Sequence, residues 1–319
     1  MSDATLRVRV ARKWSEARDI CGLELASADG SPLPAFDAGA HIDVHLPGGF
    51  VRQYSLCNDP AERGRYEIAV LREASGRGGS AAVHDVLAQG QELQIGGPRN
   101  LFPVVREGEH HLLLAGGIGI TPIVAMAEQL CAAGKSFMLH YCARTPERTA
   151  FRERIARSRF SVQARIHYDD GAPEQRFDAA SVLAAAAPGT HLYVCGPRGF
   201  IDAMLDAARV AGWPETQLHF ESFSAGNGAA APGETFAVRV SSSGLEVPVP
   251  ADRTVIQALA AHGIEVLTSC EQGVCGTCLT RVLAGEPDHR DQYLTDEERT
   301  SGCFLPCVSR GKGTLVLDL

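Results

Sequence analysis

The sequence lacks the features that mark nucleic-acid-binding, membrane and exported proteins. Its 319 residues contain no basic block and carry a formal net charge of −8 at pH 7, so no positive surface is available to engage the phosphates of a nucleic acid. No run of about 18 apolar residues occurs, and the N-terminus has no apolar segment of the kind found in signal peptides. We therefore expect a protein that neither spans a membrane nor is exported.

A disulfide pattern is missing as well. Six of the ten cysteines are scattered in apolar or motif contexts: Cys21, Cys57, Cys131, Cys142, Cys195 and Cys303. This scatter predicts a reduced, cytoplasmic protein. The chain also lacks a C-x-H motif paired with a C-x2-H motif, which excludes an iron–sulfur cluster with mixed cysteine and histidine ligands.

The other four cysteines follow one spacing. Cys270, Cys275 and Cys278 form C-x4-C-x2-C, and Cys307 follows after 28 intervening residues. This is the spacing of the ligands of a plant-type 2Fe–2S cluster. Two glycines inside the loop would let backbone N–H groups approach the sulfur atoms. The spacing predicts such a cluster and a role in electron transfer.

Two alternatives concern these ligands. A structural zinc site usually takes two separated pairs of ligands, whereas here three cysteines are clustered and the fourth is remote. Cys303 competes with Cys307 as the fourth ligand. We favour Cys307, because Pro306 has a fixed φ and can present the next residue rigidly.

The pattern of apolar residues divides the chain into regions. Residues 1–105 alternate apolar and polar positions, as in 41–46 and 66–71, which predicts an antiparallel β-barrel. Residues 106–225 alternate buried strands with helices, which predicts a parallel α/β sheet. Its strands are expected at 111–115, 137–142, 162–167, 191–195 and 217–220, and its helices are expected to start at Thr121-Pro122 and Thr145-Pro146.

The last part of the chain begins after a stretch of small and polar residues. This stretch, residues 226–234, is expected to be a linker. Residues 235–319 suit a compact α+β ferredoxin domain, with a helix over 254–261 and a capping box at 295–298.

Two motifs in the first region together suit a flavin nucleotide. Arg52-Gln-Tyr-Ser-Leu56 offers an aromatic plane and a hydroxyl, and Gly76-Arg-Gly-Gly-Ser80 offers backbone N–H groups to a phosphate. Taken alone, a strand tyrosine is more often core and a glycine turn more often structural. The expected flavin-binding residues are Arg52, Tyr54, Ser55, Arg77, Gly78, Gly79 and Ser80.

Two glycine turns in the α/β region suit a pyrophosphate. They lie in 116–122 and 195–200, each directly after a predicted strand, and neither matches G-x-G-x-x-G. Besides the residues of these two turns, Arg144 and Asp169 are expected to contact the nucleotide. Asp169 and Asp170 would favour NADH by accepting from a ribose 2′-hydroxyl, whereas Arg144 and Arg148 could hold the 2′-phosphate of NADPH.

In this order, the motifs resemble the phthalate dioxygenase reductase family, which includes vanillate demethylase reductases. The resemblance covers nearly the whole chain. It implies an FMN barrel, an NADH-binding domain and a β-grasp 2Fe–2S ferredoxin domain that passes electrons to a separate Rieske-type terminal oxygenase. It also places the fourth cluster ligand directly before Val308. The nucleotide-binding residues that the resemblance implies are Gly116, Gly117, Gly119, Thr121, Cys195, Gly196 and Pro197.

The resemblance further implies catalytic roles for Ser55, Cys195 and Phe223, the last as an aromatic ring beside the flavin. Phe220, an apolar strand residue, is expected in the core. A flavin is required because nicotinamide gives two electrons as one hydride, whereas an iron–sulfur cluster takes one at a time.

Three alternatives stay open. FAD could replace FMN, although no surface for an adenylate tail is identified. The acceptor could be a di-iron monooxygenase or a cytochrome, but reductases of those systems commonly carry the ferredoxin domain at the N-terminus. A redox sensor without catalysis is opposed by the complete nucleotide site.

Overall fold

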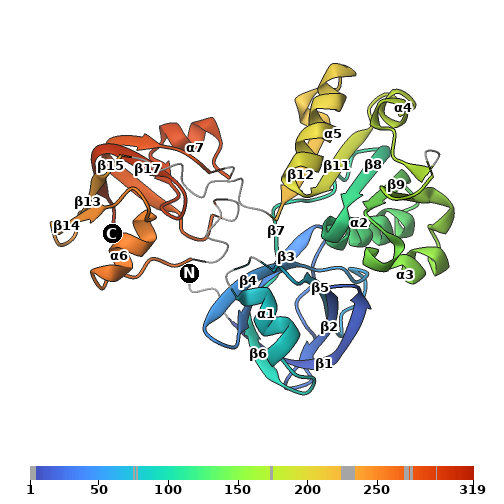
Figure 1. Ribbon diagram of the computed structural model, residues 1–319, viewed down its shortest axis with the longest axis horizontal. Coiled ribbons are helices and arrows are strands. Elements are labelled where there is room, and N and C mark those ends of the chain that lie inside the picture. Colours follow the sequence, from blue (N-terminus) through green and yellow to red (C-terminus); the bar gives the residue numbers. More distant parts are fainter. Residues whose placement is uncertain are drawn as a thin grey trace. The chain divides into compact units, whose positions relative to one another are not determined.

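The computed structural model describes residues 5–74, 76, 78–172, 175–223, 234–268, 273, 276–291 and 293–319. The chain forms two compact units, Met1–Phe223 and Ser224–Leu319 (Figure 1). The predicted linker falls outside the described residues except for Glu234, and the predicted boundary at residue 105 stays a prediction. No helix in the described part of the chain is long and apolar enough to cross a membrane.

The first unit begins with an antiparallel sheet of seven strands. These are β1 (Leu6–Ala17), β2 (Ile20–Ser27), β3 (Ala40–Leu46), β4 (Phe50–Ser55), β5 (Tyr66–Leu71), β6 (Glu92–Ile95) and β7 (Arg99–Asn100). Their order is β4-β3-β6-β1-β2-β5, with β7 paired to β3. The antiparallel domain is as predicted, whereas its closure into a barrel stays a prediction because no pairing among the described strands joins β4 to β5.

A short helical segment follows β5. It consists of α1 (Gly79–Ala81) and the π-helical turn η1 (Ala82–Val86), which Leu87 closes by donating its N–H to the Ala82 carbonyl at 2.9 Å. Within this turn the Val86 side chain is 60% exposed. The i→i+5 turn holds more residues than an α-helical turn and rotates Val86 away from the core.

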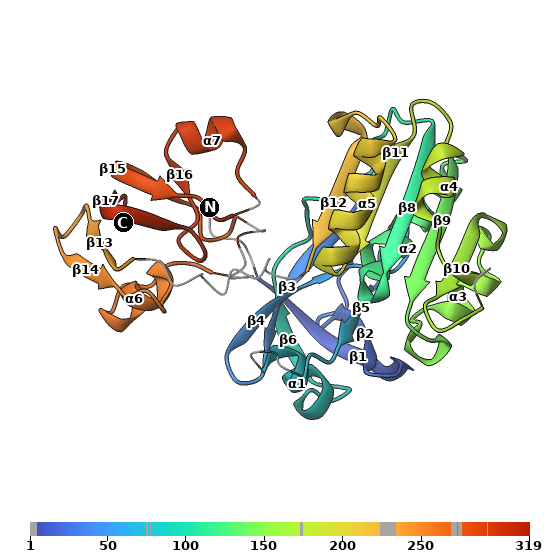
Figure 2. The same ribbon diagram turned by 45° about the horizontal axis from the view of Figure 1, so that its top comes forward.

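The rest of the first unit is an α/β sheet with the strand order β10-β9-β8-β11-β12, in which every pairing is parallel (Figure 2). The strands are β8 (His110–Gly116), β9 (Ser136–Ala143), β10 (Ala164–Tyr168), β11 (His191–Gly196) and β12 (Leu218–Ser222). The helices are α2 (Ile120–Ala132), α3 (Arg152–Arg157), α4 (Ala179–Ala184) and α5 (Arg198–Val210), with 3-10 turns at η2 (Gly117–Gly119), η3 (Pro146–Arg148), η4 (Ser161–Gln163) and η6 (Glu215–Gln217). Alternate strand residues face opposite sides, so one face packs against α2 and α3 and the other against α4 and α5.

Three local predictions need correction. Thr121 is not the N-cap of α2, because η2 precedes the helix and makes Gly119 the cap; the Thr121 hydroxyl instead donates to the Ile118 carbonyl at 3.1 Å. The start signal at Thr145 opens only the 3-10 turn η3. The strand predicted from Val162 begins at Ala164, and Val162 is exposed in η4.

The two sheets of the first unit share a core and several polar contacts. Ile20 and Cys57 from the antiparallel domain belong to the same apolar cluster as α2. Ala38 donates its N–H to Gln129 Oε1 at 2.8 Å, and Arg154 on α3 pairs with Glu67 on β5 at 3.3 Å. These contacts join the antiparallel domain to α2 and α3 of the parallel domain.

The second unit is a mixed sheet with the order β14-β13-β17-β15-β16. Its strands are β13 (Phe236–Val240), β14 (Glu246–Val249), β15 (Thr280–Asp288), β16 (Cys303–Phe304) and β17 (Arg310–Leu317), and its helices are α6 (Val255–Ala261) and α7 (Asp296–Thr300). Each helix begins with a capping box, at Thr254 and at Thr295, so both predicted helices are confirmed. The α+β prediction agrees with this arrangement.

Candidate functional site

The turn before α1 lies directly on strand β4. Gly78 has φ of +90°, and a Cβ atom there would come within 2.9 Å of the Phe50 ring. A Cβ at Gly79 would come within 2.7 Å of Arg52 Nε, so only glycine lets the backbone approach the guanidinium this closely. Ser80 Oγ accepts the Glu73 N–H at 3.1 Å and fixes the turn. The structure thus brings Arg52 and the predicted phosphate turn together; Arg77 lies outside the described residues.

Tyr54 and Ser55 point to opposite sides of β4 because they are neighbours on a strand. Tyr54 is half-buried against the core of the antiparallel domain, and burial raises the pKa of its hydroxyl. Ser55 is buried, and its hydroxyl makes no hydrogen bond of ordinary geometry with the described residues. The buried Gln53 Nε2 and His41 Nε2 are also without partners in this part of the structure.

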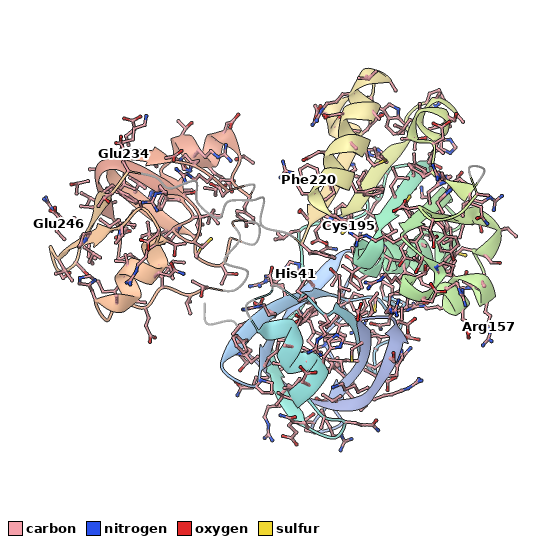
Figure 3. The ribbon with its side chains drawn as sticks, in the orientation of Figure 1. His41, Arg157, Cys195, Phe220, Glu234 and Glu246 are labelled. Atoms are coloured by element: carbon pink, nitrogen blue, oxygen red, sulfur yellow. The ribbon has the colours of Figure 1, made fainter. Side chains whose placement is uncertain are left out.

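His41 lies across from Ser55 in the β3–β4 pairing. Burial lowers the pKa of His41 to about 4, so the ring is neutral at pH 7. In Figure 3, His41 and Cys195 lie where the antiparallel and parallel sheets of the first unit meet. Buried polar atoms without partners are costly in a folded protein unless a ligand or water completes them. The region beside β4 therefore suits a bound polar group.

Glu221, which the sequence reasoning missed, lies at the same place. It is the penultimate residue of β12, in register with Cys195 on β11. Its Oε2 is buried without a hydrogen bond of ordinary geometry among the described residues. Burial raises the pKa of Glu221 to about 8, against a smaller lowering by the nearby Ser55 hydroxyl, so at pH 7 this carboxyl can donate a hydrogen bond. Cys195 is fully buried, and burial raises the pKa of its thiol.

The two predicted glycine turns are in contact. A Cβ at Gly119 would overlap the Cys195 carbonyl, and a Cβ at Gly196 would come within 3.0 Å of Gly116 Cα. Gly117 has φ of +56° and no neighbouring atom within 4 Å of its Cβ position. Pro197 is the N-cap of α5, as Gly119 is of α2. Two helix N-termini therefore meet at one edge of the sheet, where open parallel sheets bind nucleotides.

Arg144 and Asp169 lie at the same edge. They directly follow the neighbouring strands β9 and β10, and both are exposed. Asp169 donates its N–H to the Ala143 carbonyl at 3.1 Å. Arg148, the second residue that could hold a 2′-phosphate, pairs with Asp19 at 2.9 Å, so part of its charge is already compensated.

The prediction that Phe220 is a core residue is wrong. Phe220 is 44% exposed and Phe223 is 36% exposed. The physical reason is the position of β12, which is the outer strand of the sheet; an outer strand is covered less completely than a central one.

The cysteine loop is described only in part. Cys270 and Cys275 lie outside the described residues, whereas Cys278 and Cys307 are each 3% exposed and belong to one small core with Leu294 and Leu305. Cys303 is half-buried at its margin.

Two glycines shape this loop. Gly273 and Gly276 both have φ of +71°, and added Cβ atoms would overlap Val308 and the Tyr293 ring, respectively. The loop therefore passes close to the residue that follows Cys307. A Cβ at Gly273 would also lie 3.1 Å from Asp291 Cα. The buried Asp291 carboxylate accepts the Leu294 N–H at 2.9 Å, which fixes the backbone beside the loop.

Comparisons with known proteins agree with this arrangement. The family described as 2Fe-2S iron-sulfur cluster binding domain matches residues 238–312, and the N-terminal domain of the dimethylamine monooxygenase subunit DmmA-like family matches residues 98–218. A vanillate O-demethylase oxidoreductase of Pseudomonas sp. (strain HR199 / DSM 7063) is 53% identical, over 95% of this chain and 96% of its own length.

Solved structures that are similar over 99% of this chain include two with more than 40% sequence identity. A phthalate dioxygenase reductase, described as modular for electron transfer from pyridine nucleotides to [2Fe-2S], is 44% identical with a TM-score of 0.79 and is covered over 98%. An intact type IV self-sufficient cytochrome P450 monooxygenase is 41% identical with a TM-score of 0.83 and is covered over 41%. The chain is an oxidoreductase with a 2Fe–2S cluster-binding domain, and it belongs to the family of the phthalate dioxygenase and vanillate O-demethylase reductases.

Proposed function

We propose that the chain is the NADH-dependent reductase component of a Rieske-type aromatic-ring oxygenase or demethylase system. It would pass electrons from NADH through FMN and the 2Fe–2S cluster to a separate terminal oxygenase. The first unit brings together the two glycine turns, the buried side chains of Ser55 and Glu221, and the Gly78–Ser80 turn beside Arg52. This arrangement is the observation that carries the proposal. A bound flavin would accept two electrons as hydride and release them singly.

The residues around this place have separable roles. Arg52 and the N–H groups of the Gly78–Ser80 turn would hold the flavin phosphate, and the Tyr54 side chain would lie along the flavin ring system. Gly116, Gly117, Gly119, Thr121, Gly196 and Pro197 would form the pyrophosphate cradle of NADH, with Arg144 and Asp169 near the adenosine ribose. Ser55, Cys195 and Phe223 would border the reacting rings, where the Glu221 carboxyl can donate to a ring or amide oxygen.

The proposed division of the chain is residues 1–105 for FMN, 106–225 for NADH, a linker over 226–234, and 235–319 for the cluster. Cys270, Cys275, Cys278 and Cys307 would be the cluster ligands. We propose the cytoplasm as its location because the cysteines show no disulfide pattern.

A cytochrome P450 is the second candidate acceptor. The similar P450 chain contains a region that matches this whole chain, so a C-terminal ferredoxin domain does not by itself disfavour a haem acceptor. Rates of NADH-dependent turnover with a purified Rieske oxygenase and with a purified P450 would separate the two. A P450 that is reduced while every aromatic-ring oxygenase tested stays oxidised would contradict the Rieske assignment.

The flavin extracted from the purified chain is expected to be FMN, at one per chain. A monophosphate can end at the Gly78–Ser80 turn beside Arg52, whereas no second surface for an adenylate is apparent among the described residues around that turn. Chromatography of the released flavin, beside iron and sulfide analysis, provides the measurement. FAD in the extract would show that the phosphate is not the end of the cofactor.

We expect kcat/KM for NADH to exceed that for NADPH, and the Asp169→Asn substitution to reduce this preference about tenfold. A carboxylate near the ribose accepts from the 2′-hydroxyl and repels a 2′-phosphate, and about 1.4 kcal/mol corresponds to tenfold. Asp206→Asn on α5, where Asp206 is exposed and pairs with Arg209, is the control. An unchanged ratio in Asp169→Asn would remove this residue from the site.

A further inference from the structure

Lys13 reaches the far end of the helical segment that begins with the proposed phosphate turn. Its Nζ donates to the carbonyls of Val83, His84 and Leu87 at 2.8, 2.9 and 2.7 Å. A lysine ammonium has three N–H donors, so all of them can be used here. These carbonyls close the segment 79–87 and carry the partial negative charge of a helix C-terminus, which a cation stabilises.

A β-bulge in β1 explains how a lysine comes to face this segment. Val10 lies opposite Leu25 in β2, but the register shifts between Val10 and Arg12, so that Lys13 lies opposite Leu23. Leu23 and Leu25 are both fully buried. Without the bulge the alternation would turn position 13 outward, because neighbouring strand residues face opposite sides. The bulge re-aims the lysine inward, as bulges commonly do beside functional sites.

Two further contacts bind the same segment to β5 and the residue after it. His84 Nε2 is 2.9 Å from the Val70 carbonyl, and Arg72 makes two hydrogen bonds to Asp85, the second at 2.8 Å. The Arg72–Asp85 pair is largely exposed, so it contributes little. Lys13 is only partly exposed and makes three charge-assisted bonds, which are stronger than neutral ones.

We propose that Lys13 is a positioning residue for the flavin phosphate: it fixes the segment 79–87 on β1, so that the N–H groups of the Gly78–Ser80 turn are held over Arg52. This inference rests on the proposed FMN site. The turn has little freedom of its own to correct an error, because the atoms of Arg52 and Phe50 already fill the places of the Gly79 and Gly78 side chains. Small displacements of preorganised donors weaken binding strongly.

The test is the affinity of the full chain, freed of its flavin, for FMN and for riboflavin, which lacks the phosphate. In Lys13→Met we expect the Kd for FMN to rise about tenfold or more, while the Kd for riboflavin changes less than about twofold. Lys13→Gln keeps one donor group and should fall between wild type and Lys13→Met. Arg9→Met, which removes an exposed charge from the same strand, should leave both affinities unchanged.

Equal losses of FMN and riboflavin affinity in Lys13→Met would show general damage to the domain and overturn the inference, as would an unchanged FMN affinity. If Lys13→Met does not fold, the same comparison of the Kd values for FMN and for riboflavin in Lys13→Gln tests the inference. A wild-type chain that binds riboflavin as tightly as FMN would instead remove the proposed phosphate site, and the role of Lys13 with it.

Discussion

In the Cys275→Ser variant, NADH-dependent reduction of cytochrome c or of a terminal oxygenase is expected to fall at least about 100-fold, while NADH-dependent reduction of ferricyanide stays nearly unchanged. Cys275 is the middle cysteine of C-x4-C-x2-C, and a serine hydroxyl is a poor substitute for a thiolate ligand of iron. The proposed flavin and nucleotide residues all belong to the first unit, Met1–Phe223. In the proposed electron path, hydride transfer to the flavin precedes the cluster and would therefore be unaffected by the loss of Cys275.

The two activities can be separated because the two units have separate cores. The apolar cluster around Val238 and Leu315 contains only residues of the second unit, and the clusters of the first unit contain none of them. The control is Cys131→Ser, at a half-buried cysteine on α2 outside the loop, which should retain both activities. Loss of ferricyanide reduction together with the cluster would mean that electrons reach ferricyanide through the cluster, or that the second unit supports the flavin site.

Local patterns predicted those parts of the site that short stretches of sequence encode. The glycine turn at 116–119 is such a case: one run of residues ends β8, forms the turn and begins α2. Prediction failed at the next level of detail, since Thr121 was expected to cap α2 and the preceding 3-10 turn moved the cap to Gly119. The sequence signal for a cap does not distinguish an α-helical start from a 3-10 turn that leads into one.

Features that depend on distant parts of the chain escaped prediction. Glu221 reads as an ordinary charged residue until β12 aligns it with Cys195 and the antiparallel sheet brings Ser55 beside it. Lys13 reads as an exposed strand residue until the bulge in β1 reverses its face. Phe220 shows the opposite error, because a strand pattern does not reveal which strand will be outermost in the sheet.

We expect Cys307→Ser to lose most of its iron and its visible charge-transfer bands, and Cys303→Ser to keep both. Cys307 is buried in the same small core as Cys278. The cysteine loop passes against its neighbour, since a Cβ at Gly273 would overlap Val308. Cys303 instead begins β16, where its backbone pairs with that of Arg281 in β15.

The hydrogen bonds around the two cysteines lead to the same expectation. Val308 and Ser309 both donate their N–H groups to the Leu305 carbonyl, at 3.3 and 3.0 Å, so Cys307 lies inside a tight turn that fixes its direction. Cys303 Sγ lies 3.7 Å from the Ser301 hydroxyl, a contact that serine at position 303 could reproduce. Iron analysis and the visible spectrum of both variants provide the measurement. A 2Fe–2S cluster of this type needs four thiolates, so only the loss of a true ligand should remove it. A colourless Cys303→Ser protein beside a coloured Cys307→Ser protein would therefore make Cys303, and not Cys307, the fourth ligand.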